Sequence, residues 1–284
     1  DLRLDKFMAK NNHTINDLID NLDDLLKGID FSYLDLFKYA NLDDIGRLKR
    51  EIKDLKENYK LEKYETYLLS QYDKIKMKYS DWLKGMILVI YMKQYQEQKT
   101  IESKFFDEIS NLMYTQGQEE TISELPKKKR KKVRLLTIPE AFTLQLLATD
   151  CFNGYKWYDY KQGLVKRNAD NFYTKVNEAM QTGKELSMNN EALISLVRKQ
   201  SNAYLNKKKD TQDKSQKIIP TDKEQYDFYK DQYSGSLDNM ISLISNQAYL
   251  AGMKAQGCKK CIFIAVLDSH TTEMCKSLDG QVFN

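Results

Sequence analysis

Proline and glycine are scarce in this chain, which has 284 residues but only 3 prolines and 11 glycines. An all-β sandwich or barrel needs frequent turns, and its sequence therefore holds more of both residues. The longest apolar stretch, GMILVIYM at 85–92, is far shorter than the roughly 20 residues that span a bilayer. These shortages argue against a β-rich fold, and we expect no membrane partner.

Cysteine and histidine are also scarce, with four cysteines and two histidines. A secreted disulfide scaffold holds more cysteines in a shorter chain, so we expect a reducing compartment. Neither histidine belongs to a recognisable catalytic triad. The phosphate-binding motifs G-x-x-x-x-G-K-[ST] and G-x-G-x-x-G do not occur. We therefore expect no enzyme activity, no cofactor and no small-molecule substrate.

Apolar residues at helical spacing are abundant in the first 125 residues. In the segment 14–30 they form one face, with Thr14 as the expected N-cap and Gly28 as the expected stop. The same spacing continues over 44–98, where Gly85 is expected to break or kink the helix, and over 101–117. Residues 1–125 are therefore predicted to form an elongated helical bundle or hairpin.

A basic stretch, PKKKRKKVR at 126–134, interrupts this pattern, and seven of its last eight residues are cationic. The change in composition predicts a linker over 126–136. Three interpretations are open: a solvated linker without a partner, a nuclear-localisation signal, and an electrostatic contact with DNA or an acidic protein surface. Such a contact would have no sequence readout. Its residues would be Lys127, Lys128, Lys129, Arg130, Lys131, Lys132 and Arg134.

Helical patterns return over 137–256, which we predict to be a central helical domain. Pro139 is the expected N1 residue of its first helix, Gly183 the expected C-cap of a helix that starts near Trp157, and a last helix is expected over Asp222–Ala255. The pattern then changes, because CIFIAVLD at 261–268 and LDGQVF at 278–283 are typical of strands. Residues 257–284 are therefore predicted to start a small C-terminal α+β module. We expect that module to be incomplete here and the chain to be part of a longer product.

The same terminal region has a spacing that is compatible with metal binding. Cys258, Cys261, His270 and Cys275 form C-x₂-C-x₈-H-x₄-C, and zinc favours thiolate and imidazole ligands. The eight-residue gap fits no standard zinc ribbon or knuckle. The alternative is that the cysteines pack in a small core, so zinc stays a secondary hypothesis.

The terminal segment DSHTTEMCKSLDGQVF at 268–283 resembles the signature of phage minor head proteins, the Mu protein F-like head-morphogenesis (minor capsid) family. The residues that carry the resemblance are Asp268, Thr271, Thr272, Cys275, Leu278, Gly280 and Phe283. FNGYKWYDYKQGLVKRNADNF at 152–172 is similar to the central part of such proteins from Gram-positive phages. The preceding helix departs from the family, because Ser242–Ser245 lacks the arginine that often stands there.

The resemblance covers about 137–284 and implies a structural virion component. Such proteins are present in low copy at the portal vertex and the capsid interior, and assist head assembly and genome packaging or delivery. The expected partners are the portal protein, capsid or scaffold proteins, and packaged DNA. The expected location is the virion, after assembly in the cytoplasm of the bacterial host. Two alternatives stay open: a sequence-independent DNA-binding protein, and the non-catalytic part of a longer chain with a C-terminal enzyme domain.

Overall fold

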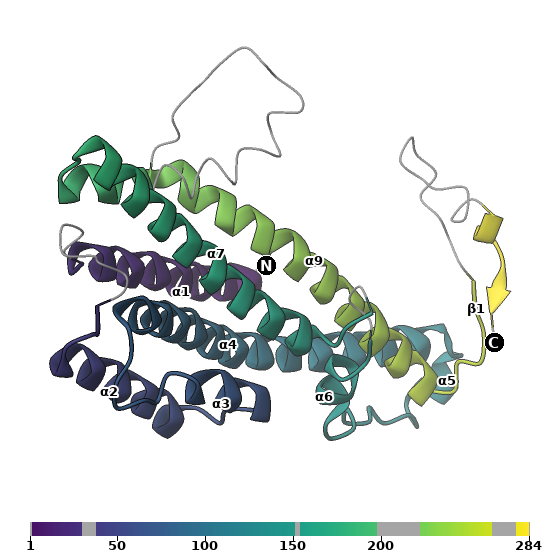
Figure 1. Ribbon diagram of the computed structural model, residues 1–284. Helices are drawn as coiled ribbons and strands as arrows, with labels where there is room; N and C mark the ends of the chain where they lie inside the picture. Colours follow the sequence, from purple (N-terminus) through teal and green to yellow (C-terminus); the bar gives the residue numbers. More distant parts are fainter. Residues whose placement is uncertain (1, 30–37, 151–153, 198–221, 263–276, 284) are drawn as a thin grey trace, which may run out of the picture. The chain divides into compact units, whose positions relative to one another are not determined.

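The computed structural model describes residues 2–29, 38–150, 154–197, 222–262 and 277–283, and these residues are mainly α-helical, as predicted. The elements, drawn in Figure 1, are α1 (Leu2–Lys27), α2 (Leu42–Asn58), α3 (Lys63–Ser70), α4 (Tyr79–Glu124), α5 (Lys127–Arg130), α6 (Phe142–Leu147), α7 (Trp157–Leu186), α9 (Asp222–Ala255), β1 (Cys261–Ile262) and β2 (Val282–Phe283). A further helical segment covers 190–197. Within these ranges, no helix combines the length and hydropathy of a membrane span.

The chain divides into two compact units, and each unit joins two separate stretches of sequence. Unit 1 consists of Asp1–Ser103 and Ala148–Ser236, and unit 2 of Lys104–Leu147 and Leu237–Asn284. The division does not follow the contiguous regions expected from the sequence, because α4 and α9 each contribute to both units. The predicted division into the regions 1–125, 137–256 and 257–284 stays a prediction.

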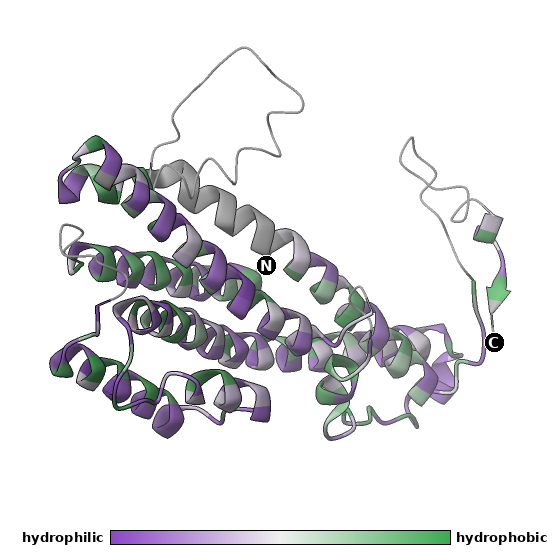
Figure 2. Cartoon of the chain, viewed as in Figure 1, coloured by the Kyte–Doolittle hydropathy of each residue, from purple (hydrophilic) through white to green (hydrophobic). Residues whose placement is uncertain are grey.

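The core of unit 1 is built from the apolar faces of amphipathic helices. In α2 the buried residues are Ile45, Leu48, Ile52 and Leu55, at the spacing of three and four residues that places them on one face. Figure 2 shows this alternation as green and purple sides of the same helices. Burying a leucine or isoleucine side chain contributes about 1.5–3 kcal/mol, so these faces are the main source of stability of the unit.

Several predicted helix ends are confirmed. α1 ends at Lys27, and Gly28 follows it. α9 ends at Ala255 with Gly257 in the left-handed conformation (φ +88°). The Gly257 N–H donates to the Lys254 carbonyl at 2.9 Å and the Cys258 N–H to the Met253 carbonyl at 3.1 Å. This pair of bonds is a Schellman motif, and it satisfies carbonyls that the helix end would leave unpaired.

Three other predicted breaks are wrong, because each residue has a packing role inside a helix. Thr14 lies buried within α1, where its hydroxyl donates to the Asn11 carbonyl at 2.9 Å. α4 passes through Gly85 without a break, and the alternative of a kink at this residue stays a prediction. A β-carbon there would approach side-chain atoms of Leu48 and Tyr72 to 2.8 and 2.9 Å, so the glycine makes room for neighbouring residues.

Gly183 is likewise not a C-cap, because α7 continues to Leu186 and a β-carbon at Gly183 would collide with the Leu193 side chain. The left-handed residue after this helix is Ser187, at φ +51°. Pro139 is not the first residue of a helix either: α6 begins at Phe142, after Ala141 at φ +61°. The interruptions in 44–98 instead lie at 59–62 and 71–78.

In unit 2, α4 and α9 approach each other closely at two glycines. A β-carbon at Gly117 would collide with the backbone carbonyl of Tyr249, and one at Gly252 would collide with that of Tyr114. The two contacts are reciprocal, since each helix supplies one glycine and one carbonyl three residues before it. The two backbones therefore meet where a side chain cannot fit, which fixes the register of α9 on α4.

The C-terminal residues include a short antiparallel pair. β1 pairs with β2, with Cys261 opposite Phe283 and Ile262 opposite Val282. Gly280, at φ +74°, lies in the turn before β2, as expected for the Asp279-Gly280 sequence. The rest of the predicted strand at 261–268 lies outside the described residues. The complete α+β module therefore stays a prediction.

Candidate functional site

The basic stretch 126–134 lies on the surface of unit 2. Pro126 starts the short helix α5, and its carbonyl accepts from the Lys129 N–H at 2.7 Å. The predicted contact residues Lys127, Lys128, Lys129, Arg130, Lys131, Lys132 and Arg134 are all exposed. Arg130 uses Nε to donate to the Leu125 carbonyl at 2.6 Å, next to the end of α4. The six other cationic side chains of the stretch do not donate to the Leu125 carbonyl. Because all seven side chains are exposed, the stretch presents positive charge to solvent.

A buried glutamine attaches the end of this stretch to α4. The Gln118 side chain is fully buried; its Nε2 donates to the Leu136 carbonyl at 2.8 Å and its Oε1 accepts from the Leu136 N–H at 2.7 Å. The side-chain amide of Gln118 therefore makes the two hydrogen bonds to the Leu136 backbone that a neighbouring β-strand would make. Residue 136 is held on α4, although the sequence alone suggested a linker over 126–136.

The same glutamine connects to the end of α9. Gln256 Nε2 donates to Gln118 Oε1 at 2.7 Å and to the Arg134 carbonyl at 3.3 Å. In Figure 1, α5 lies beside the C-terminal end of α9, in agreement with these contacts. One polar cluster thus joins α4, the basic stretch and the end of α9.

The residues of the terminal motif are only partly described. Asp268, Thr271, Thr272 and Cys275 lie outside the described residues. Leu278 is half-buried, Gly280 is exposed in its turn, and Phe283 belongs to β2. The structure therefore places the end of the motif beside β1, and the role of the other motif residues stays a prediction.

The proposed zinc ligands are also only partly described, because His270 and Cys275 lie outside the described residues. Cys258 is half-buried with a free thiol, whose Sγ donates to the Lys260 carbonyl at 3.1 Å. Cys261 belongs to β1. In the described part of the chain, no group of three or more His, Cys, Asp or Glu residues is arranged to hold a metal. A zinc site of Cys258, Cys261, His270 and Cys275 stays a prediction.

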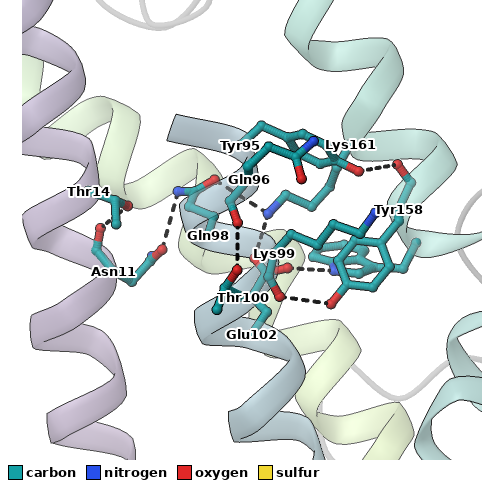
Figure 3. Close-up of polar contacts among 11 residues, drawn as sticks. Asn11, Thr14, Tyr95, Gln96, Gln98, Lys99, Thr100, Glu102, Tyr158 and Lys161 are labelled. Atoms are coloured by element: carbon teal, nitrogen blue, oxygen red, sulfur yellow. Dashed lines mark hydrogen bonds and ion pairs between the residues drawn. The ribbon is translucent and has the colours of Figure 1, made fainter. Parts of the chain in front are cut away.

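Unit 1 contains a buried polar network that the sequence did not reveal (Figure 3). Lys161 Nζ of α7 lies 2.5 Å from Glu102 Oε1 of α4, and their side chains are 6% and 0% exposed. Trp157 Nε1 donates to the other carboxylate oxygen of Glu102 at 3.0 Å. Gln98 Oε1 accepts from Lys161 at 3.4 Å. The carboxylate and the ammonium group thus both have partners, which a buried ion pair needs.

The network continues to other helices. Gln98 Nε2 donates to Asn11 Oδ1 of α1 at 3.2 Å, and Gln162 Nε2 donates to Glu65 Oε1 of α3 at 3.0 Å. Glu65 also accepts from the Glu62 backbone N–H at 2.7 Å, in the capping box that starts α3. Four helices of unit 1 are therefore connected by polar side chains within the core.

Burial lowers the pKa of Lys161, and the adjacent Glu102 carboxylate opposes that shift. Burial also raises the pKa of Tyr95, and the nearby Glu65 and Glu62 carboxylates raise it further. The described network has no Ser, Cys or His nucleophile–base pair, and its members are paired with one another. Its contacts join α7 to α4 and, through Gln98 and Gln162, reach α1 and α3. Trp157 and Trp82 are 1% and 3% exposed, so these two aromatics belong to the core.

Comparisons with known proteins give no match: no family model, no curated protein and no solved structure resembles the chain at a significant level.

Proposed function

We propose that the chain is a bacteriophage minor capsid (head-morphogenesis) protein. It acts as a structural component at the portal vertex and capsid interior, where it assists head assembly and genome packaging or delivery. Its proposed partners are the portal protein and capsid or scaffold proteins, and its proposed location is the virion after assembly in the host cytoplasm. The support comes from the terminal motif and from the mainly helical fold.

The observation that carries the proposal is the pairing at the two ends of the motif-bearing segment. β1 and β2 are antiparallel, and Gly280 takes the left-handed conformation just before β2. The residues themselves predict a strand at 261–268, a turn at Asp279-Gly280 and a second strand after it, with the motif residues in between. The described residues are compatible with that order.

The test is capture by the portal protein encoded in the same phage genome. Immobilised portal protein is expected to retain the chain, and the variant Gly280→Val is expected to be retained less. A β-branched residue is strained at φ +74°, so the turn before β2 would be disturbed. The matched control is Gly163→Ala, at an open position in α7. Equal, negligible retention of all three proteins by the portal would contradict the portal contact.

A sequence-independent DNA-binding protein is the second candidate, favoured by the exposed basic stretch 126–134. Lys and Arg side chains bind phosphates with release of counterions, so affinity falls steeply as salt rises. Salt-dependent DNA binding without portal capture would favour this candidate over the first. The enzyme alternative depends on sequence beyond residue 284, and reading the gene there decides it.

A further inference from the structure

Two segments that are far apart in sequence carry cationic side chains to the same end of unit 2. The first is the basic stretch 126–134. The second, the α9-end lysines, consists of Lys254 in the last turn of α9 and Lys259 and Lys260 just after it, all exposed. The link between them is Gln256, whose side chain donates to the Arg134 carbonyl.

The geometry keeps the two segments close. Gly257 ends α9 in its left-handed conformation, so the chain turns at this point and does not continue along the helix axis. Lys259 is three residues beyond Gln256, and its Cα is therefore within about 11 Å of the Gln256 Cα. The Debye length is about 10 Å at 0.1 M ionic strength. This length is comparable to the backbone span from Gln256 to Lys259, so we expect a polyanion at this end of unit 2 to meet the charges of both segments.

The charge at this end of unit 2 is dominated by one sign. Residues 117–136, 239–262 and 277–283 hold ten cationic residues and four carboxylates, which are Glu119, Glu120 and Glu124 in the last turns of α4 and Asp279 in the turn before β2. Glu120 is already a hydrogen-bond acceptor of the Tyr249 hydroxyl and of Gln116 Nε2. The lysines of the two segments form no salt bridge with the described part of the chain.

We propose that the basic stretch and the α9-end lysines form one composite surface that binds the phosphate backbone of double-stranded DNA. The inference rests on the second candidate function, DNA binding by the basic stretch, and adds Lys254, Lys259 and Lys260 to that contact. Lysine ammonium groups spread over two segments recognise a repeating row of phosphates, since each ammonium meets a separate phosphate as a point charge.

The composite surface is tested with the full chain and a random-sequence DNA duplex, by measuring log Kd against log salt concentration. Each phosphate neutralised changes the slope by about 0.9. The triple variant Lys254→Gln, Lys259→Gln, Lys260→Gln is expected to reduce the slope by about two to three. Lys127→Gln, Lys128→Gln, Lys129→Gln is expected to have an effect of similar size.

The matched control is Lys53→Gln, Lys56→Gln, Lys60→Gln, in the last two turns of α2 and just after it, in unit 1. It removes the same charge from exposed positions, and its slope is expected to match that of the unchanged chain. Circular dichroism checks that every variant keeps its helices.

The outcomes separate the inference from the proposed function. A reduced slope only in the basic-stretch variant overturns the composite surface and leaves the proposed DNA contact intact. An unchanged slope in both variants overturns both. Equal reduction in all three variants shows a dependence on net charge alone and also overturns the composite surface. A further outcome is negligible DNA binding together with salt-dependent binding to the portal protein that both variants lose. This outcome identifies a protein as the partner and overturns the DNA inference.

Discussion

Lys161 Nζ and Glu102 Oε1 are 2.5 Å apart in the core of unit 1, and the two residues are separated by 59 positions in the sequence. The pair joins α7 to α4, and Trp157 and Gln98 complete its hydrogen bonding. A buried charge that loses its partner is costly, although replacing a whole buried pair by apolar groups can be neutral. We therefore expect the pair to specify how α7 lies on α4.

Removing one member of this pair is expected to destabilise unit 1 strongly. Lys161→Met leaves the Glu102 carboxylate buried and uncompensated, which costs about 3–5 kcal/mol. The double variant Lys161→Met, Glu102→Gln is expected to lose less, because no charge is left in the core. Urea unfolding followed by tryptophan fluorescence measures both, since Trp82 and Trp157 belong to unit 1.

The control for this comparison is Lys166→Met, which breaks an exposed ion pair with Asp170 on the same helix. Exposed pairs contribute about 0–1 kcal/mol, so a small effect is expected. Equal losses of unfolding free energy for Lys161→Met and Lys166→Met would contradict a structural role of the buried pair.

Unit 1 is expected to lose stability as the pH rises above about 10, the unperturbed pKa of tyrosine. Burial raises the pKa of Tyr95, Tyr72 and Tyr173. A group whose pKa is raised on folding contributes stability below its unfolded pKa, and that contribution is lost as the pH rises toward its folded pKa. Lys161 acts in the opposite direction, because its pKa is lowered on folding.

The variant Tyr95→Phe tests this pH dependence. It removes the most strongly shifted phenol, together with a weak hydrogen bond of 3.4 Å to the Tyr158 carbonyl. The loss of unfolding free energy between pH 9 and 11, a range of about one unit on either side of the tyrosine pKa, is expected to be smaller than in the unchanged chain. An identical pH profile for the two proteins would show that Tyr95 does not titrate with folding.

The close approach of α4 and α9 predicts that an alanine at Gly252 lowers stability. The same substitution at Gly163, which lies in open space on α7, is expected to raise it. Gly252→Ala places a methyl group against the Tyr114 carbonyl and is expected to destabilise unit 2 by about 1–3 kcal/mol. Gly163→Ala, in open space on α7, is expected to stabilise its helix by about 0.5–1 kcal/mol. Hydrogen exchange of amides in each helix reports both effects, and faster exchange in α9 is expected only for Gly252→Ala. Unchanged protection of α9 would contradict the close approach.

The sequence predicted helices well where the signal was local. Gly28 and Gly257 follow the last residues of α1 and α9, because a helix end is decided by its own few residues. It failed where a glycine makes room for a side chain of another segment. Gly85 makes room for Leu48 and Tyr72, and Gly183 for Leu193, and no local pattern distinguishes such a glycine from a helix stop.

The candidate site shows the same limit. The basic stretch is visible in the sequence because its charges are consecutive. Its connection to the end of α9 is not visible, since Gln256 and Arg134 are 122 positions apart. Lys161 and Glu102 are hidden for the same reason: a lone lysine and a lone glutamate in amphipathic helices are normally exposed. Only the packing of α7 on α4 brings them together.

The most direct test of the central proposal is quantitative mass spectrometry of virions purified from a phage whose genome encodes this chain. The chain is expected in these particles at low copy relative to the major capsid protein, and at a constant ratio to the portal protein. A variant phage with the Gly280→Val substitution is expected to incorporate less of it. Its absence from intact, DNA-filled virions and from assembling heads alike would contradict the account.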